Sequence, residues 1–514
     1  MGFASILFGS LTETGQPAEP PFFSDLNLDQ VFAAVATGRD EYRLMPFFRL
    51  PLRDPAAVAY RHEVFRDLEK EPVVGAVLGF AARMRAVRQY LAQAGRLRYR
   101  FQKERWFLDA AVGYCDAVRT LTSALAAAGA ASRGLSALRG ELAAYAGSAN
   151  FTGLAAEAAQ ASRALQDIRY CVILRGNRVT VTGYDGEPDY SAEVAATFAK
   201  FAQGAVGDYR GTFEGPPGAD SVEERILEEV ARLFPEAFGL LEGFCGRHAG
   251  FMDETVMTFD REIQFYLSYL DYIAPVKAAG LAFSYPQVSV GDKVARADAA
   301  FDLALAAKLV PESAAVVPSD FRLSGPERII VVTGPNHGGK TTFARMFGQI
   351  HYLASLGCPI PARDAALSLP DQIFTHFQRE ADLAARRGEL EDELYRIGDV
   401  LDRATGSSLL VMNESFASTT LRDARLIGEQ VLDRMTGLGL LGVYVTFVDE
   451  LASYSAAIVS MAASMVPGKP AERTFQIVRQ PADGLAYAAA VAEKYGLTYR
   501  QLKAQLPALS GGAA

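Results

Sequence analysis

The chain has few of the residues that cross-link a protein or bind metals. Its 514 residues include only four cysteines and five histidines, and both types are widely scattered. The cysteines are Cys115, Cys171, Cys245 and Cys358. No two of them have the short spacing of a zinc or redox motif, and four thiols cannot brace a chain of this length. We therefore expect reduced cysteines without a chemical role and no structural zinc site.

A positive net charge and long apolar runs are also lacking. Lys and Arg number 51 against 60 Asp and Glu, a net charge of −9 that gives no general attraction to nucleic acid or to an anionic membrane. Any DNA contact must therefore use a local basic surface. The N-terminus has no basic stretch ahead of an apolar run of secretory length. The longest uncharged stretch, residues 451–468, is serine-rich and favours a strand and turn over a membrane span. We expect a cytoplasmic protein.

What is present predicts a folded chain of several domains. Charged residues make up 22% and aromatic residues 10%, which excludes a disordered chain, and the length suggests two to four domains. Residues 25–170 are rich in Ala and Leu and predict packed helices, among them 58–68 and 135–165. Residues 172–181 predict a β-hairpin that turns at Gly176-Asn177.

Two further changes of pattern follow along the chain. Ser221 and Glu224 form a capping box that predicts the start of a helix, and helical sequence continues to about residue 285. From about residue 300, short apolar runs alternate with helical ones, which is typical of an α/β domain with a largely parallel sheet. The expected organisation is an N-terminal tail (1–24), a helical body with a β insertion at about 170–215 (25–300), an α/β domain (301–500) and a C-terminal tail (501–514).

One motif in the α/β domain indicates nucleotide binding. The buried-strand pattern at 328–333 leads into a stretch that satisfies G-x-x-x-x-G-K-[ST] in full. The residues of this phosphate-binding loop are Gly334, Pro335, Asn336, His337, Gly338, Gly339, Lys340, Thr341 and Thr342. Glycines let backbone N–H groups close around phosphates, and the positive end of the following helix is aimed at them. Lys340 adds a charge, and the Thr341 hydroxyl is placed for Mg²⁺. The predicted cofactors are ATP and Mg²⁺.

A second strand, residues 409–413, supplies the other catalytic candidate. Glu414 follows it directly and can act as the general base that polarises the attacking water. Asn413 occupies the position where such ATPases normally carry an Asp, so it can contact Mg²⁺ only through a bound water and adds no charge. We expect an ATPase of low turnover. The alternative is a site that binds ATP and does not hydrolyse it.

The ordered motifs resemble the ATPase domain of the MutS family of DNA mismatch-repair proteins. They are the stretches GPNHGGKTT, GCPIPA, DQIFTHF, LLVMNES and QPADGLAYAAAVAEKYGL. More weakly, residues 51–54 resemble the start of the family's core domain and residues 270–286 the end of its lever helices. The resemblance therefore implies a multidomain fold, in which an all-α core and lever body with a small β-hairpin precedes a P-loop ATPase domain.

The resemblance also implies function. Proteins of this family form dimers whose ATPase sites face each other, and the levers convey the nucleotide state to a body that encircles DNA. Carried over by motif, Lys340, Thr341 and Glu414 are the catalytic set, and Asp423 couples the two sites. We expect a cytoplasmic homodimer that binds mismatched or branched duplex DNA and no membrane. The alternative is a nucleotide-switched scaffold with little hydrolysis and no mismatch recognition. A transporter subunit is disfavoured, because the sequence at 509–512 that echoes the transporter signature follows every other motif.

Several positions depart from the family pattern. Besides Asn413, Gly388 stands where the family has a serine that acts across the dimer, near Asp382-Leu383, and Phe447 stands in place of its phosphate-sensing histidine. Val316 takes the place of the aromatic that stacks on adenine. Only about 25 residues precede the core, so we expect the mismatch-reading and connector domains to be missing. Residues 234–236 match the Phe-x-Glu mismatch wedge by letters alone, at a predicted helix end.

Two segments of the helical body are candidate DNA contacts. Residues 96–106 interleave basic and aromatic side chains, a composition suited to phosphate contact and base stacking. The alternative is an ordinary helix with its aromatic side chains in the core. Arg175 and Arg178 flank the hairpin turn where the family inserts its DNA clamp. They could contact phosphate, or serve only solubility.

Overall fold

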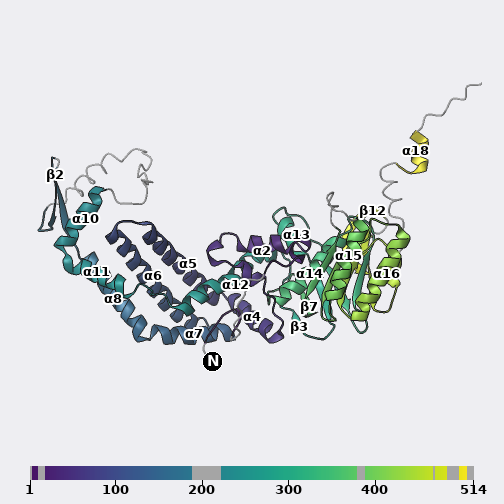
Figure 1. Ribbon diagram of the computed structural model, residues 1–514, viewed down its shortest axis with the longest axis horizontal. Helices are drawn as coiled ribbons and strands as arrows, with labels where there is room; N and C mark the ends of the chain where they lie inside the picture. Colours follow the sequence, from purple (N-terminus) through teal and green to yellow (C-terminus); the bar gives the residue numbers. More distant parts are fainter. Residues whose placement is uncertain are drawn as a thin grey trace, which may run out of the picture. The chain divides into compact units, whose positions relative to one another are not determined.

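The computed structural model describes residues 3–9, 18–176, 178–187, 221–378, 388–466, 469–482 and 497–505. The chain divides into two compact units. We call Met1–Ala4 with Asp67–Asp260 the helical unit, and Ser5–Arg66 with Arg261–Ala514 the α/β unit. Figure 1 labels their helices and strands.

The helical unit is built on long helices that pack along their length. Its elements are α5 (Glu71–Arg96), α6 (Arg100–Ala127), α7 (Arg133–Ala146), α8 (Ala149–Gln166), β1 (Tyr170–Arg175), β2 (Arg178–Gly183), α10 (Ser221–Leu233) and α11 (Pro235–Arg247). α5 and α6 run side by side (Figure 1). α5 buries an apolar stripe because residues spaced by three and four turn to one face, as Val73, Val77 and Phe80 do. The predicted helices of this region are therefore present, with a break at Gly147-Ser148, where the Ser148 side chain caps α8.

The hairpin also forms as predicted. β1 and β2 pair in antiparallel register from Tyr170–Gly183 to Arg175–Arg178, and Gly176 has the positive φ of 59° that its turn requires. Asn177 lies outside the described residues. α10 begins at Ser221, as the capping box indicates, and packs against β2.

The α/β unit contains the predicted mainly parallel sheet. Its N-terminal elements are α1 (Phe22–Asp25), α2 (Leu28–Ala36), η1 (Asp40–Tyr42) and α3 (Met45–Phe48). α4 (Pro55–Leu68) and α12 (Glu254–Ala278) run across the unit division. The remaining elements are β3 (Gln287–Ser289), β4 (Ala295–Ala300), α13 (Leu303–Leu309), β5 (Ser319–Leu323), β6 (Ile329–Thr333), α14 (Lys340–Ser355), β7 (Asp364–Ser368), β8 (Ile373–Phe377), α15 (Glu389–Arg403), β9 (Leu409–Asn413), α16 (Leu421–Leu438), β10 (Leu441–Val445), η2 (Asp449–Ser453), β11 (Ile458–Val466), β12 (Lys469–Arg479) and α18 (Tyr499–Gln505).

Two sheets organise this unit. The larger has the order β12-β11-β6-β10-β9-β8, in which only β12 is antiparallel to its neighbour. The smaller has the order β3-β7-β4-β5. Every residue of β6, β9 and β10 is buried, as expected of parallel strands covered on both faces.

Helices cover both faces of the larger sheet. Alternate strand residues point to opposite faces. Ile329 and Val331 of β6 join a core cluster with residues of α15 and α16, and these two helices lie on the same side of the sheet in Figure 1. α14 packs against β9 and β10. The parallel order brings the carboxyl ends of β6, β9 and β10 to one edge, which is where ligands bind in open α/β sheets.

The unit division differs from the boundary expected near residue 300. Residues 5–66 pack with the α/β domain instead of the helical body, because α14 is covered by N-terminal residues. Tyr352 donates to the Phe48 carbonyl at 2.8 Å, and the buried Arg61 guanidinium donates to the Leu356 carbonyl at 2.7 Å. These partners lie about 300 residues apart in sequence, so local patterns could not pair them.

No helix in the described ranges combines the length and apolar character that crossing a membrane requires. None of the four cysteines forms a disulfide with a described residue.

Candidate functional site

The loop between β6 and α14 has the backbone shape that its sequence predicts. Gly334, His337 and Gly339 have positive φ values of 113°, 61° and 92°. A Cβ atom on Gly338 would lie 2.8 Å from the Ala463 side chain and 2.9 Å from the Pro335 oxygen, and one on Gly339 would lie 2.9 Å from the Phe475 oxygen. The loop can therefore close this tightly only with glycine at both positions. The positive φ of His337 agrees with a role for its backbone more than for its ring.

Lys340 starts α14 and turns back over the loop. Its Nζ donates to the Gly334 oxygen at 2.9 Å, and to the Pro335 oxygen and Asn336 Oδ1 at 3.2 Å each. Nζ also lies 4.0 Å from a carboxylate oxygen of Glu414. Burial lowers the pKa of Lys340, and the nearby Glu414 carboxylate opposes that shift. The loop thus holds a buried cation whose ligands are mostly neutral oxygens.

A cavity of about 610 Å³ opens beside this lysine. One part of its wall is apolar and consists of Leu305, Leu309, Ala315, Val317 and Phe475. The other part is polar and consists of Asn336, His337, Gly339, Lys340, Thr341, Thr342 and Glu414. An elongated ligand with an apolar ring at one end and anionic groups at the other matches this division.

Glu414 reaches the cavity from the end of β9. Because β9 and β10 are parallel neighbours, its amide donates to the Val445 oxygen at 3.0 Å across the sheet edge. Its backbone has a positive φ of 52°, unusual for a residue with a Cβ. The side chain is 41% exposed, so the carboxylate meets both solvent and Lys340.

Asn413 lies just before it and is buried. Its Oδ1 atom makes no hydrogen bond to any described residue. A buried amide oxygen without a partner fits a bound water or a water-coordinated cation. Thr341, the other predicted Mg²⁺ residue, lines the cavity next to Lys340. The described ranges contain no group of three or more His, Cys, Asp or Glu side chains placed to hold a metal. A cation here would thus depend on Thr341, Asn413, water and phosphate.

Apart from Asn413, which directly precedes Glu414, the positions that depart from the family pattern are not among the residues that line this cavity. Val316 packs against the apolar cluster of Val276, Phe301 and Ala306, so its neighbours Ala315 and Val317 line the cavity instead. Val316 is half-buried and is not among the residues that line the cavity, and its assignment to the stacking position stays a prediction.

Phe447, Asp423 and Gly388 also lie outside the lining of this cavity. Phe447 lines a separate surface hollow with Asp449 and Glu450. Asp423 lies in the first turn of α16, whose N-terminal cap is Thr420: the Thr420 hydroxyl accepts from the Asp423 amide at 3.2 Å and donates to the Asp423 carboxylate at 2.8 Å. Its role across a dimer stays a prediction. Gly388 precedes α15, while Asp382-Leu383 and nearly all of the last motif lie outside the described residues.

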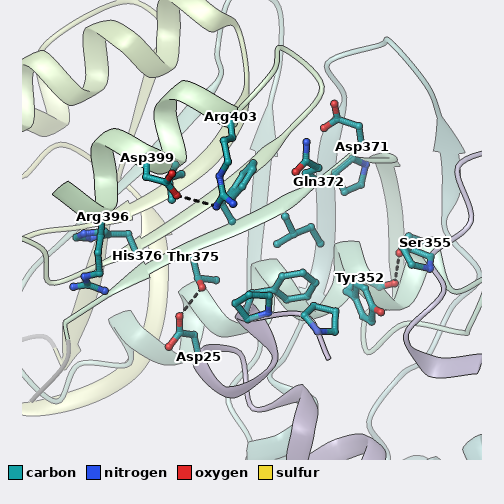
Figure 2. A pocket seen from close by; sticks show the side chains of 18 of the residues that line it. Asp25, Tyr352, Ser355, Asp371, Gln372, Thr375, His376, Arg396, Asp399 and Arg403 are labelled. Carbon is teal, nitrogen blue, oxygen red and sulfur yellow. Dashed lines mark hydrogen bonds and ion pairs between the residues drawn. The ribbon is translucent and has the colours of Figure 1, made fainter. Parts of the chain in front are cut away.

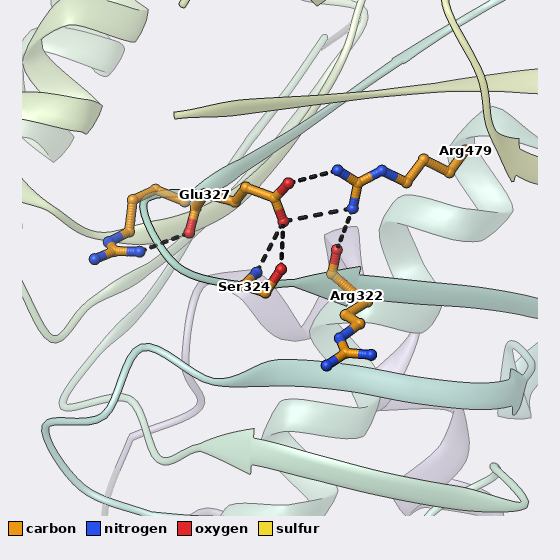
Figure 3. A network of polar contacts seen from close by, with 5 residues as sticks. Arg322, Ser324, Glu327 and Arg479 are labelled. Carbon is orange, nitrogen blue, oxygen red and sulfur yellow. Dashed lines mark hydrogen bonds and ion pairs between the residues drawn. The ribbon is translucent and has the colours of Figure 1, made fainter. Parts of the chain in front are cut away.

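Sequence reasoning missed Phe475. This residue of β12 is 53% exposed, lines the cavity and has a positive φ of 62°. The nearby Arg479 anchors β12: its guanidinium pairs with Glu327 and donates to the Arg322 oxygen (Figure 3). Partial burial tends to raise the pKa of Glu327, but hydrogen bonds from Arg479 and Ser324 outweigh it and lower that pKa. No local pattern signals Phe475, since it meets the loop only through the fold.

The first candidate DNA contact in the helical unit is the segment of residues 96–106. Between residues 96 and 106, the aromatic side chains pack inside the unit: Phe101 contacts Phe238 edge-on, and Trp106 contacts Tyr90. Arg100 pairs with Glu104 and Glu242, and Arg105 pairs with Asp109. These contacts support the ordinary-helix interpretation. Phe234 to Glu236 lie at the junction of α10 and α11, the helix end that was predicted.

The hairpin arginines remain open candidates. Arg175 and Arg178 face each other across the end of the hairpin and are exposed. Neither forms an ion pair with a described residue, so both are available to an anionic partner.

Comparison with known proteins agrees with this geometry. Residues 330–508 match MutS domain V. A DNA mismatch repair protein MutS from Psychrobacter cryohalolentis is 34% identical over 126 residues, which cover 24% of this chain and 12% of that protein. One from Syntrophomonas wolfei is 30% identical over 154 residues, which cover 29% of this chain and 18% of that protein. The chain thus spans less than a fifth of the length of either relative. Through residues 330–508, the chain is similar to domain V of the MutS family.

Proposed function

We propose that this chain binds ATP with Mg²⁺, hydrolyses it slowly, and couples this cycle to DNA binding as a homodimer. The observation that carries the proposal is the 610 Å³ cavity, in which the phosphate-binding loop, Lys340 and Glu414 converge beside an apolar wall. The family match supports the same interpretation.

Different residues of the chain bind the phosphates, hold Mg²⁺ and activate the attacking water. Loop amides and Lys340 hold the phosphates, and Thr341 and Asn413 hold Mg²⁺, the latter through water. Bound Mg²⁺ would neutralise charge on the terminal phosphates. Glu414 accepts a proton from the attacking water; its exposed carboxylate has solvent access and lies 4.0 Å from the Lys340 cation. Slow turnover follows from Asn413, which cannot supply the carboxylate charge of an Asp.

DNA binding rests on the similarity to the MutS family and on the two exposed hairpin arginines. Both MutS relatives are named as DNA mismatch repair proteins. With a net charge of −9, DNA binding should be local and strongly salt-dependent, with few phosphates neutralised. A homodimer would place two ATPase sites face to face, with DNA held by the helical units.

A second candidate is a nucleotide-switched scaffold without useful hydrolysis. The buried, neutral Asn413 and the position of Phe447 outside the cavity favour it. It binds ATP at the same loop, so binding alone does not separate the two functions.

ATPase activity titrated with plain, mismatched and branched DNA tests both. The proposed function expects Mg²⁺-dependent turnover that is stimulated by one class of DNA and lost in Glu414→Gln. Turnover that is absent in the wild type while ATP still binds would favour the scaffold. Failure of all three DNA forms to bind at low salt would contradict the DNA role.

A further inference from the structure

A buried polar network holds the backbone on which Glu414 stands. Glu414 and Phe416 both have left-handed backbones, with φ values of 52° and 64°. For residues with a Cβ this conformation is unfavourable, and it persists only where surrounding contacts enforce it. The turn after β9 therefore needs bonds that fix it.

Glu393 of α15 supplies one of these bonds. The Phe416 amide donates to Glu393 Oε2 at 3.1 Å. Glu393 is only 3% exposed, and its second carboxylate oxygen, Oε1, has no hydrogen-bond partner among the described residues. Burial raises the pKa of this carboxyl. A helix would not keep a carboxyl in such a place for packing alone, because an apolar side chain would avoid the cost of burying it.

His376 of β8 supplies the second bond and closes a ring. Its Nε2 lies 3.2 Å from the Glu393 main-chain oxygen, and its Nδ1 lies 2.8 Å from the Ser415 hydroxyl. A carbonyl oxygen only accepts, so Nε2 carries the hydrogen, and in the neutral ring Nδ1 accepts from Ser415. All three side chains are buried. The network thus runs from Glu393 through His376 and Ser415 to Phe416 and back.

The network also faces a second cavity. About 440 Å³ in volume, this cavity lies beside β8 and is lined by His376, Arg396 and Phe374, among others (Figure 2). Thr375 closes part of its edge through a hydrogen bond to Asp25. β8 is the edge strand of its sheet, so its position depends on α15 and on such side-chain contacts more than on a further strand.

We propose that Glu393 and His376 are positioning residues that orient Glu414 for hydrolysis, so that the place of α15 determines whether the general base is aligned. This inference rests on the proposed function. Neither residue touches the nucleotide cavity, and each acts only through the turn at 414–416.

Three variants test the role of Glu393. In Glu393→Ala the acceptor for the Phe416 amide is lost, and kcat for ATP should fall about tenfold while KM and ATP affinity stay within about twofold. Glu393→Gln keeps an acceptor oxygen and should retain kcat within about twofold. The matched control is Glu391→Ala, which removes an exposed carboxylate from the same helix. It should have no effect.

His376→Phe is the independent variant. It keeps an aromatic ring near Phe416 and removes both hydrogen bonds, so it too should lower kcat and spare KM. Melting temperature is measured for every variant to separate misfolding from misalignment. A fall in kcat of equal size in Glu391→Ala, or an unchanged kcat in both Glu393→Ala and His376→Phe, overturns the inference and leaves the proposed function intact.

Amide hydrogen exchange supplies a readout that needs no turnover. Exchange in a peptide covering residues 409–420 should be faster in Glu393→Ala than in the wild type, and unchanged in Glu393→Gln and Glu391→Ala. A wild type that binds ATP without hydrolysing it contradicts the proposed function, and exchange at this turn then decides the inference. Unaltered exchange in Glu393→Ala refutes it.

Discussion

The candidate functional residues of the α/β unit gather at one cavity, whereas those of the helical unit are spread over its surface. In the α/β unit, six of the nine loop residues and Glu414 at a strand end line a single cavity. Among them Lys340 is buried, and His337, Gly339 and Glu414 have left-handed backbones. In the helical unit, Arg100 and Arg105 of the basic segment pair with nearby carboxylates, and Arg175 and Arg178 lie at an exposed hairpin. The proposed phosphate binding would thus be set by local backbone geometry, whereas the proposed DNA contact would depend on surface charge that the fold can neutralise.

The largest effect should come from Lys340. In Lys340→Ala the buried cation of the loop is lost, and we expect ATP turnover to fall by at least about 100-fold, with weaker nucleotide binding. The matched control is Lys103→Ala, an exposed lysine of α6 in the basic segment of the helical unit. It should leave DNA-free turnover unchanged. The measurement is steady-state ATPase activity with nucleotide titration. Equal losses of ATP turnover in both variants would contradict the assignment of the nucleotide site to the α/β unit alone.

The second effect concerns stability and pH. His351 of α14 is fully buried and its Nε2 has no hydrogen-bond partner among described residues, so burial lowers its pKa from 6.5 to about 4. Since this pKa is lowered on folding, the stability it contributes is present above pH 6.5 and lost as pH falls toward 4. The loss should be about 3 kcal/mol. In the helical unit, burial tends to raise the pKa of Asp67, but hydrogen bonds from Lys70 and Ser132 outweigh it and lower that pKa, so Asp67 destabilises its unit only in stronger acid.

Urea unfolding of the wild type and of His351→Phe between pH 7 and pH 4 measures the His351 effect. The variant lacks the titrating imidazole ring, and all other titrating groups are present in both proteins. The difference in the free energy of unfolding between the wild type and the variant should therefore change with pH. Parallel pH profiles would show that His351 does not titrate as its burial implies.

Much of the α/β unit could be predicted from its sequence because its elements obey local rules. The buried strands at 329–333 and 409–413 and the loop glycines each follow from composition and spacing within a few residues. The features that could not be predicted from the sequence depend on contacts between residues far apart in the chain. Phe475 meets the loop through β12, Glu393 reaches Phe416 from another helix, and residues 5–66 cover α14. Val316 shows the same limit, since a shift of one residue decides whether a side chain lines the cavity or packs against the apolar cluster.

The third effect tests the absence of a carboxylate charge at position 413, in the proposed Mg²⁺ site. Asn413→Asp places a carboxylate where a buried amide oxygen has no partner, so Mg²⁺ should be held more tightly. We expect turnover to rise about tenfold and the Mg²⁺ concentration for half-maximal rate to fall. Without Mg²⁺ the new charge lies close to Glu414, and the melting temperature should drop and recover when Mg²⁺ and ATP are added. Activity and Mg²⁺ dependence that stay at wild-type values would favour the nucleotide-switched scaffold.

The smallest effect should come from the helical unit. Replacing Arg175 and Arg178 together by Ala removes two exposed cations from the end of the hairpin. If both contact phosphates, DNA affinity should fall several-fold, and the slope of log affinity against log salt should become shallower by about 2. DNA-free ATPase activity should not change, because these residues belong to a different unit from the loop. Arg232→Ala, an exposed and ion-paired arginine of α10 in the same unit, is the control. An unchanged salt slope in the double variant would place the DNA contact elsewhere. Loss of DNA-free ATPase activity in the double variant would show that the hairpin arginines affect the nucleotide site of the other unit.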